Sequence, residues 1–136
     1  VIGAQAVVFP LQIKNFINPD ESFLFVNRGQ RKTNISIRNA IHTLNSCQVS
    51  ELIVYDIDND GCGRGFNNQL HNCISKITSS RILAAGGDGK AIDITEVLSF
   101  DIDAAVISNL FAFMKGGLAR ARAASIESKA LLVKWE

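Results

Sequence analysis

The residues of this sequence that could do chemistry lie in three short turns. Gly86-Gly87, Ser108-Asn109 and Asp60-Gly61 each follow an apolar run. Glycines let a phosphate ester approach the backbone, and the free N–H groups at the start of a following helix favour its negative charge. We predict that the three turns bind phosphate together, although Gly86-Gly87 alone is equally consistent with a structural tight turn.

Three aspartates, Asp56, Asp58 and Asp60, occupy alternate positions and so project the same way. We interpret Asp58 and Asp60 as residues that cap their loop by accepting hydrogen bonds from its backbone, rather than as metal ligands. Asp60 also lies beside the predicted phosphate site, which makes it our candidate for acid/base chemistry. We expect no metal and no cofactor.

Composition restricts the class of protein. Hydrophobic residues make up 47% of the chain and the net charge is +1, so we expect a packed core and neither nucleic acid nor an anionic membrane as partner. The first four residues, 1–4, resemble no signal peptide and lack an initiator Met, so we expect a piece of a longer protein. Three cysteines without a Cys-x-x-Cys pair indicate reduced thiols and a cytoplasmic location.

Apolar runs predict four buried strands, and apolar residues three and four apart predict the helices between them. The run 23–26 follows the turn signal Asn18-Pro19-Asp20 and predicts a hairpin in the loop after the first strand. We expect Asn34 to cap the first helix. The predicted strands are 5–11, 52–54, 82–85 and 104–107, and the predicted helices carry residues 37–44, 70–77, 91–98, 109–113 and 118–130.

Strands that alternate with helices indicate a parallel sheet covered by helices. Right-handed crossovers place all four strand ends on one edge, so the three turns converge there. The two histidines, His42 and His71, fall within helices away from that edge. The tail at 130–133 could also pair as a strand, and we rank helix first.

Taken together, the segments resemble the C-terminal half of the cyclase subunit of imidazole glycerol phosphate synthase. The resemblance runs from Gly3 to about Phe113, and its order and spacing make it specific. It rests on residues 5–8, 29–38, 51–54, 58–61 with 65–66, 85–89 and 103–105.

The resemblance implies an α/β fold in which residues 1–136 form one half-barrel domain, strands five to eight of a (βα)₈ barrel. That cyclase joins ammonia from a glutaminase partner to a phosphorylated nucleotide in histidine biosynthesis, a lyase-type reaction. Glu51 matches an acidic residue that gates the ammonia entrance at the opposite end of the barrel. The family's second phosphate site matches Gly61, Gly86, Gly87, Ser108 and Asn109.

The chain departs from this pattern at Gln12, where the family has a catalytic aspartate. Glutamine does not ionise near neutral pH and so cannot act as a general acid or base. Cys62 and Asn109 also replace a threonine and a serine usual in the family. These departures fit a divergent paralogue that serves surface-polysaccharide amidotransferases. A non-catalytic phosphate-binding or ammonia-conduit half-barrel and a sugar isomerase of histidine synthesis remain as alternatives.

Four strands would leave two open edges and a bare apolar face, whereas a closed barrel needs eight strands and about 250 residues. We therefore expect an N-terminal half-barrel or a second copy of the chain as partner. The other expected partners are a glutaminase subunit and a phosphorylated small molecule.

Overall fold

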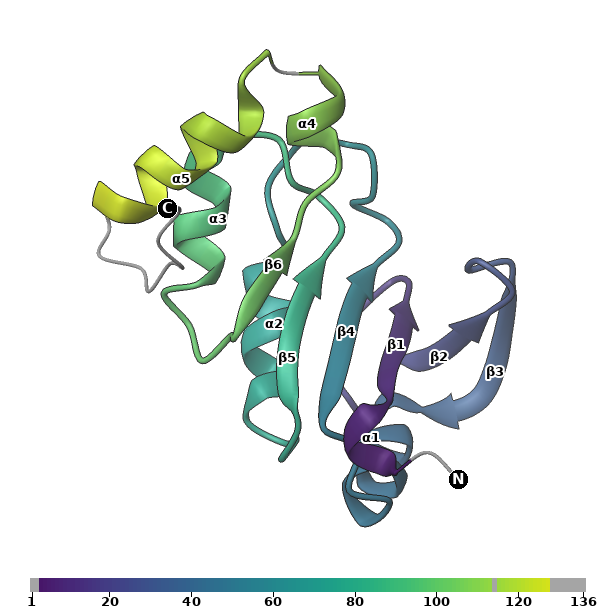
Figure 1. Ribbon diagram of the computed structural model, residues 1–136. Helices are drawn as coiled ribbons and strands as arrows, with labels where there is room; N and C mark the ends of the chain where they lie inside the picture. The colour runs from purple at the N-terminus through teal and green to yellow at the C-terminus, as the bar shows by residue number, and fades with distance from the viewer. Residues whose placement is uncertain (1–2, 114, 128–136) are drawn as a thin grey trace.

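The computed structural model describes residues 3–113 and 115–127 (Figure 1). After a 3₁₀ turn, η1 (Ala4–Ala6), strands and helices alternate as the sequence predicts. The elements are β1 (Val8–Ile13), β2 (Phe23–Val26), β3 (Arg31–Ser36), α1 (Ile37–Ser46), β4 (Glu51–Asp56), α2 (Asn68–Ser75), β5 (Arg81–Ala85), α3 (Ala91–Val97), β6 (Ala104–Val106), α4 (Asn109–Phe113) and α5 (Gly117–Glu127).

The strands form one sheet in the order β3-β2-β1-β4-β5-β6. β1, β4, β5 and β6 are parallel, which confirms the predicted four-stranded parallel arrangement. The predicted hairpin after the first strand is confirmed as β2 and β3, which in addition extend the sheet as antiparallel strands. Gln12 pairs with Phe25 and Ile13 with Leu24, so the outer edge of β1 is covered at its carboxyl end.

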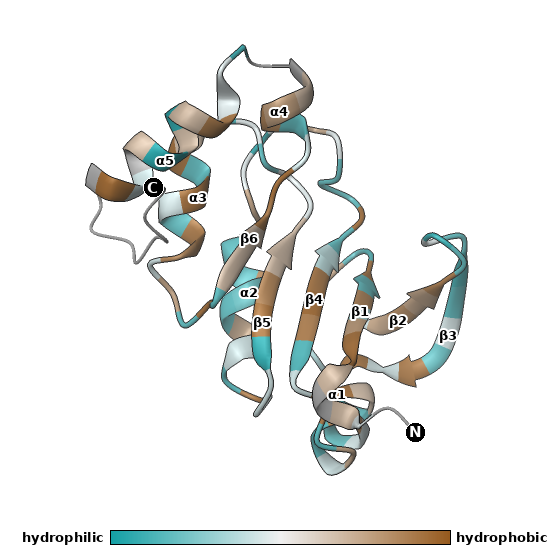
Figure 2. Ribbon diagram, in the orientation of Figure 1, coloured by the Kyte–Doolittle hydropathy of each residue, from teal (hydrophilic) through white to brown (hydrophobic). Residues whose placement is uncertain are grey.

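The core lies on one face of the sheet. Alternate residues of the parallel strands are buried there, and α2, which contacts β4, is seen behind β5 in Figure 1. Hydrophobic residues run along β1, β4 and β5 (Figure 2), which is typical of strands in a parallel sheet. The buried strand residues Leu11, Ile13, Leu52, Val54, Ile82 and Ala84 share a cluster with the helix residues Ile37, Ile41, Leu70, Ile74, Ile94 and Val97.

The intervening strand residues point to the other side, which we call the open face. Apart from Ala85, which is 4% exposed, they are only partly covered within the chain, and Val8 and Val106 are 44% and 40% exposed. The open face consists of Val8, Pro10, Gln12, Glu51, Ile53, Tyr55, Arg81, Leu83, Ala85, Ala104 and Val106.

Two local predictions are wrong. The first strand begins at Val8 rather than at residue 5, because Ala4–Ala6 form the 3₁₀ turn. The N-cap of α1 is Ser36, whose Oγ accepts a hydrogen bond from the Asn39 amide at 3.3 Å, whereas Asn34 lies within β3.

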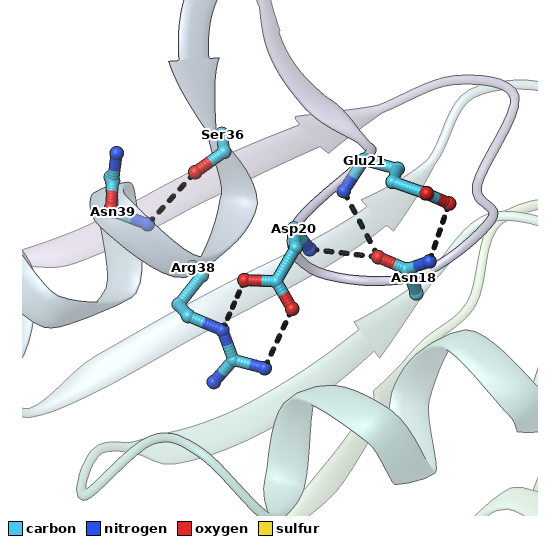
Figure 3. A network of polar contacts seen from close by, with 6 residues as sticks. All are labelled: Asn18, Asp20, Glu21, Ser36, Arg38 and Asn39. Atoms are coloured by element: carbon cyan, nitrogen blue, oxygen red, sulfur yellow. Dashed lines mark hydrogen bonds and ion pairs between the residues drawn. The ribbon is translucent and has the colours of Figure 1, made fainter.

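The turn before the hairpin is fixed by polar contacts (Figure 3). Asn18 Oδ1 accepts hydrogen bonds from the backbone amides of Asp20 and Glu21, both at 3.0 Å, as its turn signal predicts. Arg38 then binds the Asp20 carboxylate through two nitrogens at 2.5 and 3.0 Å, which lowers the pKa of Asp20. The turn is thereby tied to the first turn of α1.

The predicted tail helix is confirmed over Gly117–Glu127, as α5, which lies beside α3 (Figure 1). The alternative strand at 130–133 falls outside the described residues. Within the described ranges, no helix combines the length and the apolar character that crossing a membrane requires.

Candidate functional site

A cavity of about 340 Å³ opens on the open face where the four parallel strands end. Four of the residues singled out from the sequence line it: Gln12, Asp60, Gly86 and Ser108. The other lining residues are Pro10, Ile53, Tyr55, Ala85 and Val106. Gly61, Gly87 and Asn109 are chain neighbours of lining residues but do not themselves line the cavity.

Gly86 and Gly87 bring the end of β5 against the loop that follows β4. Their φ angles are +89° and +113°, in the region that favours glycine. A Cβ on Gly86 would lie 2.2 Å from the Asp56 carbonyl oxygen, and one on Gly87 would lie 2.2 Å from that of Gly65. Packing within the chain therefore already requires glycine at both positions.

The Ser108-Asn109 turn is capped by Asp88, which the sequence analysis missed. This buried carboxylate accepts hydrogen bonds from the Ser108 and Leu110 amides at 3.0 and 3.1 Å. The Ser108 N–H that we expected to face phosphate is thus already engaged. Asp88 does not bond the Ser108 hydroxyl or the Asn109 amide, so these two donors of the turn could bind a ligand.

The start of α3 is capped in the same manner. Asp93 accepts hydrogen bonds from the amides of Gly89 and Lys90 at 3.0 and 2.7 Å. Aspartate is a strong capping residue, so this local pattern could have been found in the sequence. The capping role of Asp88 could not have been found in this way, because the turn that it caps lies 20 positions further along the chain.

Asp60 is held by Tyr55, whose hydroxyl donates to Asp60 Oδ2 at 2.5 Å. Burial, followed by the hydrogen bond and charge of Asp60, raises the pKa of Tyr55 to about 12. Tyr55 is therefore protonated at neutral pH and donates to the carboxylate. This contact presents Asp60 at the cavity in a fixed position.

The other two aspartates bond backbone amides, but not as predicted. Asp56 is the residue that caps the loop, since its Oδ1 accepts from the Asp58 amide at 3.2 Å. Asp58 reaches across to the loop after β1 and accepts from the Asn15 amide at 2.5 Å. Within the described part of the chain, no three His, Cys, Asp or Glu residues are placed to hold a metal ion together.

Gln12 anchors the hairpin above the cavity. Its Oε1 accepts a hydrogen bond from the Gly29 amide at 2.8 Å, in the turn that joins β2 to β3. Packing at Gly29 is close, because a Cβ there would lie 2.5 Å from Ile57 Cδ1. Gln12, where the resemblance implies an aspartate, therefore has a structural contact of its own.

Glu51, for which the resemblance predicts a role at an ammonia entrance, is the first residue of β4 and so lies at the opposite end of this strand from the cavity. Its carboxylate forms an ion pair with Arg81 at 2.8 Å on the neighbouring strand. The Glu51 side chain is 28% exposed, so the pair lies at the rim of the open face.

Both histidines lie in helices away from the cavity. His42 is exposed, whereas His71 is buried between α2 and β4, with Nδ1 2.7 Å from the Asn67 carbonyl and Nε2 3.2 Å from that of Val54. Burial lowers the pKa of His71. We assign His71 a role in packing.

Comparison with known proteins points to one family. The family described as "Histidine biosynthesis protein" matches residues 1–116. Among similar proteins, imidazole glycerol phosphate synthase subunit HisF from Petrotoga mobilis is 25% identical over 114 residues, covering 82% of this chain and 44% of the relative. The same subunit from Thermotoga sp. is 28% identical over 111 residues, covering 82% and 43%.

A third relative, imidazole glycerol phosphate synthase subunit HisF from Chloroherpeton thalassium, is 28% identical over 122 residues, covering 89% of this chain and 48% of the relative. The chain thus spans about half the length of the curated relatives that it matches.

Proposed function

Because the chain belongs to the histidine biosynthesis protein family, we propose that it forms the phosphate-binding, C-terminal half of a cyclase-like (βα)₈ barrel. One observation carries the proposal: Gln12, Asp60, Gly86 and Ser108 line a single cavity at the ends of four parallel strands. Ligand sites of such barrels lie at this edge, and phosphate is often held by its last two strands. The coverage of about half of each relative supports a half-barrel.

The proposed ligand is a phosphorylated small molecule. Its phosphoryl group would use the Ser108 hydroxyl and the amide of Asn109 beside Gly86. Asp60 would then be the acid/base group, because Tyr55 donates to it and leaves its second oxygen for a substrate proton. Ammonia from a glutaminase partner would enter at the opposite rim, beside the Glu51–Arg81 pair.

A second candidate function is an ammonia conduit or phosphate-binding module without catalysis. The contact between Gln12 and Gly29 favours it, because this side chain supports the hairpin and does not supply an ionisable group. The two functions share the phosphate site and differ in whether Asp60 affects a rate.

In both cases the open face requires a partner. The proposed one is an N-terminal half-barrel that pairs with β6 and with the part of β1 that the hairpin leaves uncovered, or a second copy of this chain. Either would cover the apolar side chains Pro10, Ile53 and Val106, which a soluble protein seldom leaves as one exposed patch.

Calorimetry with inorganic phosphate and ribose phosphate tests the site. The variant Ser108→Asp places a carboxylate in the cavity and should lower the affinity at least about tenfold by charge repulsion. Gly86→Asp is a poor test, because its Cβ would collide with the Asp56 carbonyl oxygen.

The matched control is Ser99→Asp, which adds the same charge to an exposed position. Ser99 lies in the loop between α3 and β6, at the end of the parallel strands that is opposite to the cavity. The phosphate affinity of this variant should equal that of the unmodified protein. Absence of binding heat in the unmodified protein, or equal weakening in both variants, would contradict the phosphate site.

A further inference from the structure

A second, smaller cavity lies on the hairpin, outside the site described above. Its volume is about 150 Å³, and we call it the lysine notch. It is lined by Lys14, Asn15, Ile17, Glu21, Ser22, Phe23, Phe25 and Lys32. Sites for whole drug-sized ligands are about 300 Å³ or more, so this notch suits a single charged group.

Strand register brings two of the notch residues together. Phe25 pairs with Gln12 on one side and with Lys32 on the other, so these three side chains project from the same face of the sheet. Phe23 lies two positions before Phe25 and therefore shares that face. The notch is thus an extension of the open face beyond β1.

Each of the two ammonium groups lies over a phenyl ring. Lys32 Nζ is 4.2 Å from the centroid of Phe23, and Lys14 Nζ is 6.0 Å from that of Phe25. Such contacts hold a cation in place without neutralising it. The ion pairs found among residues 3–113 and 115–127 are Arg38–Asp20 and Arg81–Glu51, so neither lysine is paired there.

The residues that line the notch carry excess positive charge, two lysines against one glutamate, and the nearby Asp58 carboxylate is engaged by the Asn15 amide. Glu21 is its one lining carboxylate, and Oε2 of this residue accepts a hydrogen bond from Asn18 Nδ2 at 2.7 Å (Figure 3). Ser22 is 2% exposed, and its Oγ accepts from the Ile17 amide at 2.9 Å. The hydroxyl proton of Ser22 is still available to donate to a ligand.

We propose that the lysine notch binds the phosphate or carboxylate group of a small anionic ligand. Two ammonium groups and one buried hydroxyl would donate charge-assisted hydrogen bonds to its oxygens. The notch shares no lining residue with the cavity at the strand ends, so this inference does not rest on the proposed function.

Titration with inorganic phosphate and with acetate, at constant ionic strength, tests the proposal. Backbone amide NMR signals of Ile17, Ser22 and Phe23 should shift with a saturable curve. Lys32→Met and Lys14→Met should each weaken the affinity at least about fivefold, since each removes one charge-assisted bond. The anion that binds more tightly identifies the group.

The matched control is Arg31→Met, which removes the same charge from the adjacent position of β3, on the opposite face of the strand. Its affinity should remain within about twofold of the unmodified protein, the change expected for a screened surface charge. Ser108→Asp should leave these shifts intact, which separates this test from that of the strand-end cavity. Absence of saturable shifts, or equal weakening by Arg31→Met and Lys32→Met, would overturn the proposal.

Discussion

Tyr55 and Asp60 form the hydrogen-bonded pair that sets the chemistry of the strand-end cavity. Tyr55 is the chain's one tyrosine, so the tyrosinate absorbance band reports on this pair alone. Its raised pKa means that the folded state favours the protonated phenol. The resulting contribution to stability is complete below pH 10.0 and is lost as pH rises from there through about 12.

Replacing Asp60 should lower the pKa of Tyr55. In Asp60→Asn the acceptor charge is gone, so the absorbance midpoint should fall from about 12 towards 10.0 but stay above it, because burial is the largest cause of the shift. Asp58→Asn is the control, since Asp58 bonds the Asn15 amide and not Tyr55, and its midpoint should be unchanged. An unchanged midpoint in Asp60→Asn would show that the pair does not exist in solution.

The candidate site was predictable where its residues act through local backbone geometry. Gly86 and Ser108 follow apolar runs, and parallel strands must end on one edge, so their convergence follows from the sequence. Asp88 and Tyr55 were not predictable in this way. Asp88 caps a turn on another strand, and the partner of Tyr55 depends on how the loop after β4 folds back.

At the scale of elements, the apolar runs identified all four parallel strands, because strands buried by helices need continuous hydrophobic residues. The placement of the hairpin was not predictable, since pairing of β2 with β1 depends on tertiary contacts such as Gln12 to Gly29. The cap of α1 was misplaced because Asn34 and Ser36 are both good caps. Which of the two residues caps the helix depends on where β3 ends.

Asn45, near the end of α1, bonds the turn that follows α2. This contact lies at the amino ends of the parallel strands, away from the cavity. Asn45 Nδ2 donates to the Ile77 carbonyl at 3.2 Å, and Asn45 Oδ1 accepts from Thr78 Oγ1 and the Ser79 amide, both at 3.1 Å. Asn45→Ala should lower the free energy of unfolding by about 2 kcal/mol, because two partly buried groups, the Ile77 carbonyl and the Thr78 hydroxyl, lose their partner. Urea denaturation monitored by circular dichroism measures this loss.

The control for that variant is Asn39→Ala. Asn39 is exposed on the same helix, and its backbone rather than its side chain bonds Ser36. Alanine has the higher helix propensity, so this change should be neutral or slightly stabilising. If Asn45→Ala cost no more than Asn39→Ala, the connection would not contribute to stability.

At the scale of the whole molecule, one sheet face is a helix-covered core and the other is open. Val8 and Val106 on the open face are 44% and 40% exposed. In the proposed barrel these side chains would lie in the interior. The hairpin covers part of the β1 edge, which leaves β6 as the edge strand of the parallel set. Burial of the apolar side chains of the open face by a partner would therefore stabilise this chain further.

That argument predicts that the protein by itself associates through the open face. Sedimentation velocity over a concentration series should show a reversible shift from monomer to dimer. Ile53→Glu puts a charge at the centre of the face and should raise the dissociation constant at least about tenfold, because an unpaired charge would be buried. Ile92→Glu changes a residue that is 53% exposed on α3, outside the open face, and should leave the constant unchanged. A monomer at every concentration, or equal effects of the two variants, would mean that the open face is not an interface, and the half-barrel proposal would lose its physical basis.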